Sequence, residues 1–273
     1  MSILVTLTPA ESKRLIGKAL SVHPLVKSAM EHGRILISNG TTTGYFVEEL
    51  LGEKMDIARF ACGVVTGGVQ CMSPNDRIRS VYIRNGRKVE NDENTEVYAE
   101  LQAWVDEMGP GDVYVKGANA IDAEGNAGWL LANPKGGNIL TALPAITARG
   151  VRFLVPTGLE KLVASVPEAG RHMKGIKEYD YTFGLGCGYV TVTNAVIIHE
   201  ITALEMLTGT KAFHAASGGV GGSEGAVTLV IEGTAEQLEQ TAELLKSIKG
   251  EPAVRQWKQS CGDCSFRCWY VNS

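Results

Sequence analysis

The feature that most constrains the fold is a repeated unit: a short apolar run, a glycine-rich polar loop and then a helix. Its clearest copy is Arg-Ile-Leu-Ile-Ser at residues 34–38, followed by Asn-Gly-Thr-Thr-Thr-Gly at 39–44 and an amphipathic stretch over 45–51. A continuous apolar run of this length is typical of a strand that is buried on both faces of a parallel sheet. Looser copies start at residues 112 and 151, and helices are predicted over 94–108 and 139–149. The pattern predicts an α/β fold, with a mostly parallel sheet and helices on both faces.

Turn and cap signals delimit the remaining N-terminal elements. Thr8-Pro9 predicts the start of a helix, and a second helix is predicted over 25–32. Residues 76–89 alternate as a hairpin at a sheet edge does, and Asn85-Gly86 is a strong turn signal.

The pattern changes after about residue 176. A strand over 189–198, a helix over 200–207, two strands around a glycine-rich loop and a helix over 234–248 follow in order. This β-α-β-β-α succession predicts a smaller ferredoxin-like α+β domain. The predicted organisation is therefore an α/β domain over 1–170, the α+β domain over 176–250 and a cysteine-containing tail over 251–273.

Charge and hydropathy exclude several classes of partner. The 273 residues contain 26 Lys and Arg against 30 Asp and Glu, a formal net charge of −4, which is not the signature of a nucleic-acid-binding protein. No run approaches the roughly 18 apolar residues of a transmembrane helix, and no basic segment leads a hydrophobic one at the N-terminus. We expect a soluble, cytoplasmic protein without a nucleic-acid or membrane partner.

The loop at 38–44 has the composition of an anion-binding loop. Ligands of parallel sheets bind beyond the carboxyl ends of the strands, where helix N-termini present free N–H groups. A helix cap needs one threonine, whereas this loop has three between two glycines. It matches neither a Walker A motif nor a dinucleotide fingerprint.

Three later loops strengthen this interpretation. Residues 116–122, Lys-Gly-Ala-Asn-Ala-Ile-Asp, resemble the loop of ribose-5-phosphate isomerase A that reads Gly-Ala-Asp-x-x-Asp, and 122–126 are similar to the Asp-x-x-Gly-Asn element of CoA-transferase subunits. Lys135-Gly136-Gly137 is similar to the isomerase's Lys-Gly-Gly loop, and Glu160-Lys161 falls where the superfamily often has a Ser-Lys pair that grips phosphate. In this order the motifs resemble the sugar-phosphate isomerase/CoA-transferase-like superfamily over about residues 10–165. That superfamily includes the sugar-phosphate-sensing domains of DeoR-type repressors.

The resemblance implies a site for a small anionic ligand, such as a phosphorylated sugar or an acyl-CoA, and a homo-oligomer. The ligand-binding residues expected from the four loops are Asn39, Gly40, Thr41, Thr42, Thr43, Gly117, Ala118, Asn119, Lys135, Gly136, Gly137 and Lys161.

Catalytic candidates are fewer than an isomerase requires. Moving a proton between adjacent carbons needs a carboxylate base, but Asn119 stands where the isomerase has an acid, and 139–146 contain no Asp or Glu. Asp122 remains as the acid/base candidate, with a turn role as the alternative. CoA transfer through a glutamyl thioester would use Glu224, whose glycine-rich surroundings also suit a plain hairpin loop. A shortage of acids leaves open a non-catalytic sensing module.

Three of the six cysteines fall in one short stretch, as Cys261-x-x-Cys264-x-x-x-Cys268. Such spacing can hold zinc or an iron–sulfur cluster if Cys62, Cys71, Cys187 or a histidine supplies a fourth ligand. The alternative is a set of free thiols in a tail packed by Trp257 and Trp269. A metal or redox protein is therefore a third hypothesis.

Overall fold

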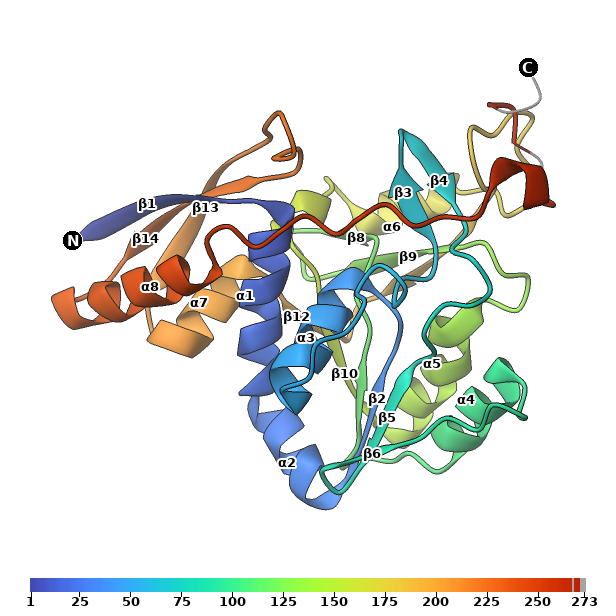
Figure 1. Ribbon diagram of the computed structural model, residues 1–273, viewed down its shortest axis with the longest axis horizontal. Helices are drawn as coiled ribbons and strands as arrows, with labels where there is room; N and C mark the ends of the chain where they lie inside the picture. The colour runs from blue at the N-terminus through green and yellow to red at the C-terminus, as the bar shows by residue number, and fades with distance from the viewer. Residues whose placement is uncertain (267, 271–273) are drawn as a thin grey trace.

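The computed structural model describes residues 1–266 and 268–270 and shows a mixed α/β protein (Figure 1). Its largest sheet has six strands in the order β12-β10-β7-β2-β5-β6. Their bounds are β2 Arg34–Ile37, β5 Val81–Arg84, β6 Arg87–Val89, β7 Val113–Val115, β10 Arg152–Pro156 and β12 Val196–Ile198. The strands β12, β10, β7 and β2 pair in parallel, whereas β5 and β6 run antiparallel at one edge.

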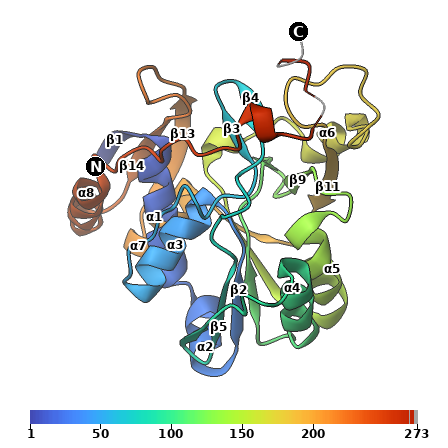
Figure 2. The same cartoon turned by 45° about the vertical axis from the view of Figure 1, so that its right-hand side comes forward.

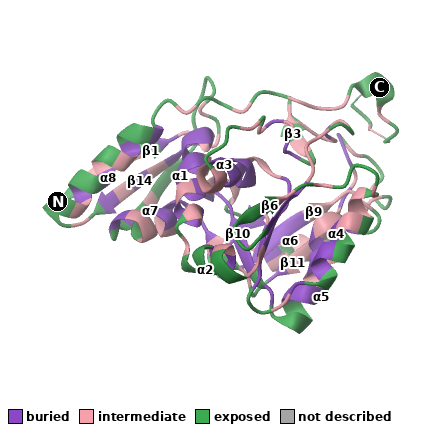
Figure 3. Ribbon diagram, turned by 60° about the horizontal axis from the view of Figure 1, so that its bottom comes forward, coloured by how far each residue is buried: buried purple, intermediate pink, exposed green. Residues whose placement is uncertain are grey.

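Side-chain alternation along these strands builds two cores. Ile35 and Ile37 of β2 face the core that contains α1 (Pro9–Ser21), α2 (Pro24–His32) and α3 (Thr41–Leu51). Leu36 between them faces a second core, built with α4 (Val97–Asp106) and α5 (Gly137–Arg149). Helices therefore cover both faces of the sheet, which explains why the strand is apolar at consecutive positions. Figure 3 shows the buried strands between helices whose outer faces are exposed.

The predicted edge hairpin is present. Asn85 and Gly86 connect β5 to β6 with positive φ angles of 48° and 75°. This left-handed conformation at both central residues matches the right-handed twist of paired strands. Likewise, Thr8 caps α1 through a capping box, as its sequence predicts.

The second sheet departs from the predicted ferredoxin-like unit at its first strand. Its order is β1-β14-β13, with β1 Ser2–Leu7, β13 Lys211–Ser217 and β14 Val227–Glu232, and α7 (Glu200–Thr208) and α8 (Ala235–Ile248) belong to the same region. The predicted strand over 189–198 is divided instead: β11 (Gly188–Val192) pairs with β9 (Ala127–Leu131), and β12 joins the central sheet. The signal that sequence analysis missed is the alternation of Ile3, Val5 and Leu7 toward the core.

Smaller elements complete the chain. The strand β8 (Ala120–Ile121) pairs with β9, and β3 (Val64–Thr66) forms a hairpin with β4 (Val69–Cys71). Short helices are η1 (Leu159–Lys161), α6 (Val166–His172) and η2 (Cys261–Asp263). After α8 the chain crosses the molecule to the β3–β4 hairpin (Figures 1 and 2). Within the described ranges, no helix is long and apolar enough to cross a membrane.

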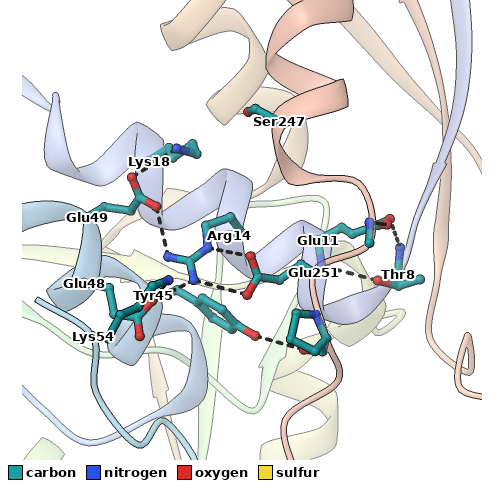
Figure 4. Close-up of polar contacts among 12 residues, drawn as sticks. Thr8, Glu11, Arg14, Lys18, Tyr45, Glu48, Glu49, Lys54, Ser247 and Glu251 are labelled. Atoms are coloured by element: carbon teal, nitrogen blue, oxygen red, sulfur yellow. Dashed lines mark hydrogen bonds and ion pairs between the residues drawn. The ribbon is translucent and has the colours of Figure 1, made fainter. Parts of the chain in front are cut away.

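A buried ion network joins α1, α3 and the segment after α8 (Figure 4). Arg14 is 5% exposed and pairs with Glu48 at 2.7 Å, Glu49 at 2.9 Å and Glu251 at 2.8 Å. Its guanidinium also lies over the Tyr45 ring, 4.5 Å from the centroid. The network fixes α3 against α1 and thereby sets the position of the N-terminus of α3.

Candidate functional site

The first part of the site is the turn between β2 and α3. The helix begins at Thr41, earlier than the predicted start at residue 45, and no side chain caps its N-terminus. Thr43 donates its hydroxyl to the carbonyl oxygens of Ser38 at 2.8 Å and Gly40 at 2.9 Å. Thr42 and Thr43 are buried, whereas Thr41 is partly exposed. The three threonines therefore do not share one role: Thr43 holds the turn, and Thr41 is the one nearest to solvent.

A hydrogen-bond network brings the N-terminus of α5 to the same place. Asn138 donates to the hydroxyl oxygens of Ser38 at 3.2 Å and Ser80 at 3.3 Å. Ser80 in turn donates to Asn39 at 3.3 Å. Like α3, α5 has no side-chain cap, and Gly136 precedes it with a left-handed φ of 77°. The predicted loops 39–43 and 135–137 are thus neighbours, and the side chain of Lys135 is exposed beside them.

The loops after β7 and β10 form the next part of the edge. The N–H of Ala118 donates to the buried hydroxyl of Thr157 at 2.8 Å, and the Gly117 carbonyl accepts from Trp129 Nε1 at 2.7 Å. The Asn119 amide oxygen accepts from the N–H of Leu130 at 3.0 Å. These groups already form hydrogen bonds within the protein, so their role is to shape the loop. Polar atoms that could contact a ligand at this edge therefore belong to other residues.

Two partly buried lysines follow the strands β7 and β10. Lys116 follows β7 directly, and Lys161 closes η1 and donates from Nζ to the Ala118 carbonyl at 3.0 Å. Among the residues described, neither ammonium group has a carboxylate within ion-pair distance. The neighbouring Glu160 pairs with Lys13 at 3.4 Å instead.

The environment of both lysines disfavours their charge. Burial lowers the pKa of Lys161 to about 8; Glu160 opposes this shift, and the charges of Lys13 and Lys116 reinforce it. Burial also lowers the pKa of Lys116. These two lysines, which have no carboxylate within ion-pair distance among the described residues, form the electrostatic centre of the candidate site.

Asp122 lies in the turn between β8 and β9. Its carboxylate accepts from the backbone N–H groups of Glu124 at 3.1 Å, Asn126 at 2.9 Å and Val166 at 2.9 Å, and from Asn126 Nδ2 at 2.9 Å. Burial alone would raise the pKa of Asp122, but the hydrogen bonds from these donors have the larger effect, so the pKa is lowered. The contacts are those of a group that holds a turn and the start of α6. The acid/base role of Asp122 stays a prediction.

Glu224 lies on the exposed loop between β13 and β14. Its carboxylate accepts from the N–H of Gly222 at 2.8 Å, and backbone N–H groups of its own loop lower its pKa. The loop ends close to Glu160, the neighbour of Lys161. A Cβ atom added at Gly225 would lie 3.0 Å from a Glu160 carboxylate oxygen. Its role as a thioester-forming nucleophile stays a prediction.

Sequence analysis did not single out Lys116, Asn138 or Glu200. Lys116 had a signal, because it is the charged residue that ends an apolar strand. Glu200 follows β12 and is fully buried, with one carboxylate oxygen accepting from the N–H of Leu159 at 2.9 Å. Burial raises the pKa of Glu200. Nothing in the local sequence distinguishes it from an ordinary acid in the first turn of a helix.

Cys261, Cys264 and Cys268 lie on the C-terminal segment beside the β3–β4 hairpin (Figure 2). All six cysteines are free thiols. In the part of the chain that the structure describes, no three His, Cys, Asp or Glu side chains are grouped so as to hold a metal ion. The predicted tail over 251–273 also includes 267 and 271–273, which lie outside the described residues.

No protein-family model matches the chain, and neither a curated protein nor a solved structure shows significant similarity to it.

Proposed function

We propose that the protein binds a small anionic metabolite at the carboxyl ends of β2, β7 and β10. The observation that carries the proposal is the pair Lys116 and Lys161, two partly buried ammonium groups that have no carboxylate within ion-pair distance among the described residues. Confining two such charges is unfavourable in the free protein and becomes favourable when an anion lies between them.

The neighbouring backbone suits the same ligand. Both α3 and α5 begin at this edge without side-chain caps, so their first N–H groups and positive dipole ends are available to an anion. Asn138 and Thr41 add polar side chains. Together with the resemblance to the sugar-phosphate isomerase/CoA-transferase-like superfamily, this favours a phosphorylated sugar or the phosphates of an acyl-CoA.

Conversion of the ligand by isomerase-type proton transfer is the second proposal, and the pKa of Lys161 favours it. A general acid or base works best when its pKa is near the working pH, and burial brings the pKa of Lys161 to about 8. Lys161 is thus a stronger proton-transfer candidate than Asp122, whose carboxylate is occupied by backbone donors. A sensing module would bind the same ligand without exchanging its protons.

Binding is tested by calorimetry and thermal shift with ribose 5-phosphate, other sugar phosphates, CoA and acetyl-CoA. A ligand at 100 times its Kd stabilises the protein by about 2.7 kcal/mol, a rise in Tm of roughly 5 °C for this chain length. Lys161→Met is expected to abolish the shift, whereas Lys27→Met is expected to keep it. Lys27 is the matched control, because it is an exposed lysine on α2, at the opposite ends of the strands.

Three results distinguish an anion site from its absence, and conversion of the ligand from binding alone. A shift that is lost in Lys161→Met and kept in Lys27→Met supports the site. No shift with any of the compounds, or equal shifts in both variants, overturns it. For the ligand that binds, incorporation of solvent deuterium into its carbon framework supports conversion, and binding without incorporation identifies a sensing module.

A further inference from the structure

A cavity lies beside the C-terminal segment, and four of the six cysteines line it. The cavity has a volume of about 230 Å³ and lies between the β3–β4 hairpin and the C-terminal segment. Cys71 comes from β4, and Cys261, Cys264 and Cys268 come from the C-terminal segment. Residues almost two hundred positions apart in the sequence thus place their thiols around one space.

Backbone hydrogen bonds hold the two sides of this cavity together. The N–H of Gln259 donates to the Met72 carbonyl at 2.9 Å, directly after β4. On the far side, the N–H of Trp269 donates to the Thr182 carbonyl at 2.8 Å, and Leu185 donates to the Gln70 carbonyl at 3.0 Å. The cysteine-bearing segment is therefore attached to β4 before its first cysteine and to the 182–185 loop after its last.

Two of the four sulfur atoms have a polar donor nearby. The backbone N–H of Gly184 points at Cys268 Sγ from 3.2 Å, and Lys258 Nζ lies 3.8 Å from Cys261 Sγ. N–H donors and a nearby cation stabilise the negative charge of a thiolate. A backbone donor directed at a cysteine sulfur also recurs around iron–sulfur clusters, where such bonds tune the potential.

The size of the cavity distinguishes between kinds of metal centre. A single zinc ion needs its sulfur ligands about 2.3 Å from one point, and no such grouping occurs among the described side chains. The cavity that the four cysteines help to line has a volume of about 230 Å³, which leaves room for a group of several atoms.

We propose that Cys71, Cys261, Cys264 and Cys268 form a four-thiolate site for an iron–sulfur cluster, with Cys71 as the ligand that the C-terminal motif lacks. The site is independent of the proposed anion site, and Lys161→Met is expected to leave it unchanged. Cys62 and Cys187 are not part of it, since neither lines the cavity.

The test is the metal and sulfide content of the full-length protein, purified without oxygen and reconstituted with equal amounts of ferrous and ferric iron and with sulfide. We expect about four iron and four sulfide per chain, the content of a four-cysteine cubane cluster, with the broad visible absorption of such clusters. Cys71→Ser and Cys264→Ser are expected to lose most of the iron. Cys62→Ser is the matched control, because Cys62 is an exposed cysteine outside the cavity.

Each other outcome overturns the proposal. No bound metal with six free thiols identifies unligated cysteines, and no metal with fewer free thiols identifies a disulfide pair. One zinc per chain that is lost in Cys71→Ser overturns the cluster in favour of a single-ion site. Iron that is retained in Cys71→Ser overturns the ligand set. Far-ultraviolet circular dichroism of each variant confirms that it is folded, and Cys264→Ser gives a second reading should Cys71→Ser not fold.

Discussion

At the scale of single residues, the site depends on which polar atoms the protein has already used. Thr43, Asn119 and Asp122 direct their side-chain oxygen or hydroxyl groups to backbone partners. Among the residues described, Lys116 and Lys161 have no carboxylate within ion-pair distance. The proposed ligand site therefore rests on these two cations more than on the glycine-rich loops.

Replacing Asp122 by Asn separates its two possible roles. Asn keeps the shape of the side chain but loses the negative charge that accepts from three backbone N–H groups. Because charge-assisted hydrogen bonds contribute about 1.5–3 kcal/mol each, we expect a loss of a few kcal/mol in the free energy of unfolding by urea denaturation. We expect the affinity for the anion to change less than about threefold. Unchanged stability with lost turnover would instead assign Asp122 to catalysis.

At the scale of elements, the first turn of α3 combines a structural role, at Thr43, with a proposed binding role, at Thr41. The sequence Thr41-Thr42-Thr43 predicts three equivalent donors to an anion, but the helix begins at Thr41, so successive side chains point in different directions. Local sequence shows the composition of this turn and not the residue at which the helix starts.

The pair Thr41→Val and Thr43→Val tests this division. Thr43→Val removes a buried hydroxyl that donates to Ser38 and Gly40, so we expect it to lower the free energy of unfolding by about 1–2 kcal/mol. Thr41→Val is expected to leave stability within about 0.5 kcal/mol and to weaken anion binding several-fold. Chemical denaturation and calorimetry measure the two effects. The reverse pattern would contradict the assignment.

At the scale of the whole molecule, sequence predicts the elements better than their pairing. The apolar run at 34–37, the Asn85-Gly86 turn and the Thr8 cap each carry a local signal, and each is present. The partners of β1, β11 and β12 depend on contacts between distant parts of the chain, so local patterns could not assign them. The same holds for Lys116 and Lys161, which belong to different loops and meet only because β7 and β10 are adjacent.

Arg14 couples the N-terminal helix to α3 and to the segment after α8. Arg14→Met would leave Glu48 and Glu251 without their main cation in a largely buried setting. Removing one partner of a buried ion pair costs about 3–5 kcal/mol, so we expect a loss of that order in the free energy of unfolding. Denaturation with urea at pH 7 measures it, and a loss below about 1 kcal/mol would contradict the role assigned to the network.

The same network makes the free energy of unfolding depend on pH in the acidic range. Burial would raise the pKa of Glu48, but the N–H of Met55 and the cations Arg14 and Lys54 lower it below the usual value near 4.5. A carboxyl group whose pKa is lowered in the folded state binds fewer protons there than in the unfolded chain. Its stabilisation is complete above about pH 4.5 and is lost as the pH falls through the folded value. Arg14→Met is expected to reduce this loss, which urea denaturation between pH 3 and pH 7 measures.

The most direct test of the anion site is the pKa of Lys161, followed by NMR of its ε-methylene with and without ribose 5-phosphate. In the free protein we expect a value of about 8, because burial and the neighbouring lysines disfavour the charged form. On binding, the ligand's negative charge stabilises the ammonium form, so the pKa is expected to rise by one unit or more. A free-state pKa near the ordinary 10.5, or a depressed pKa that neither this ligand nor CoA raises, would contradict the account.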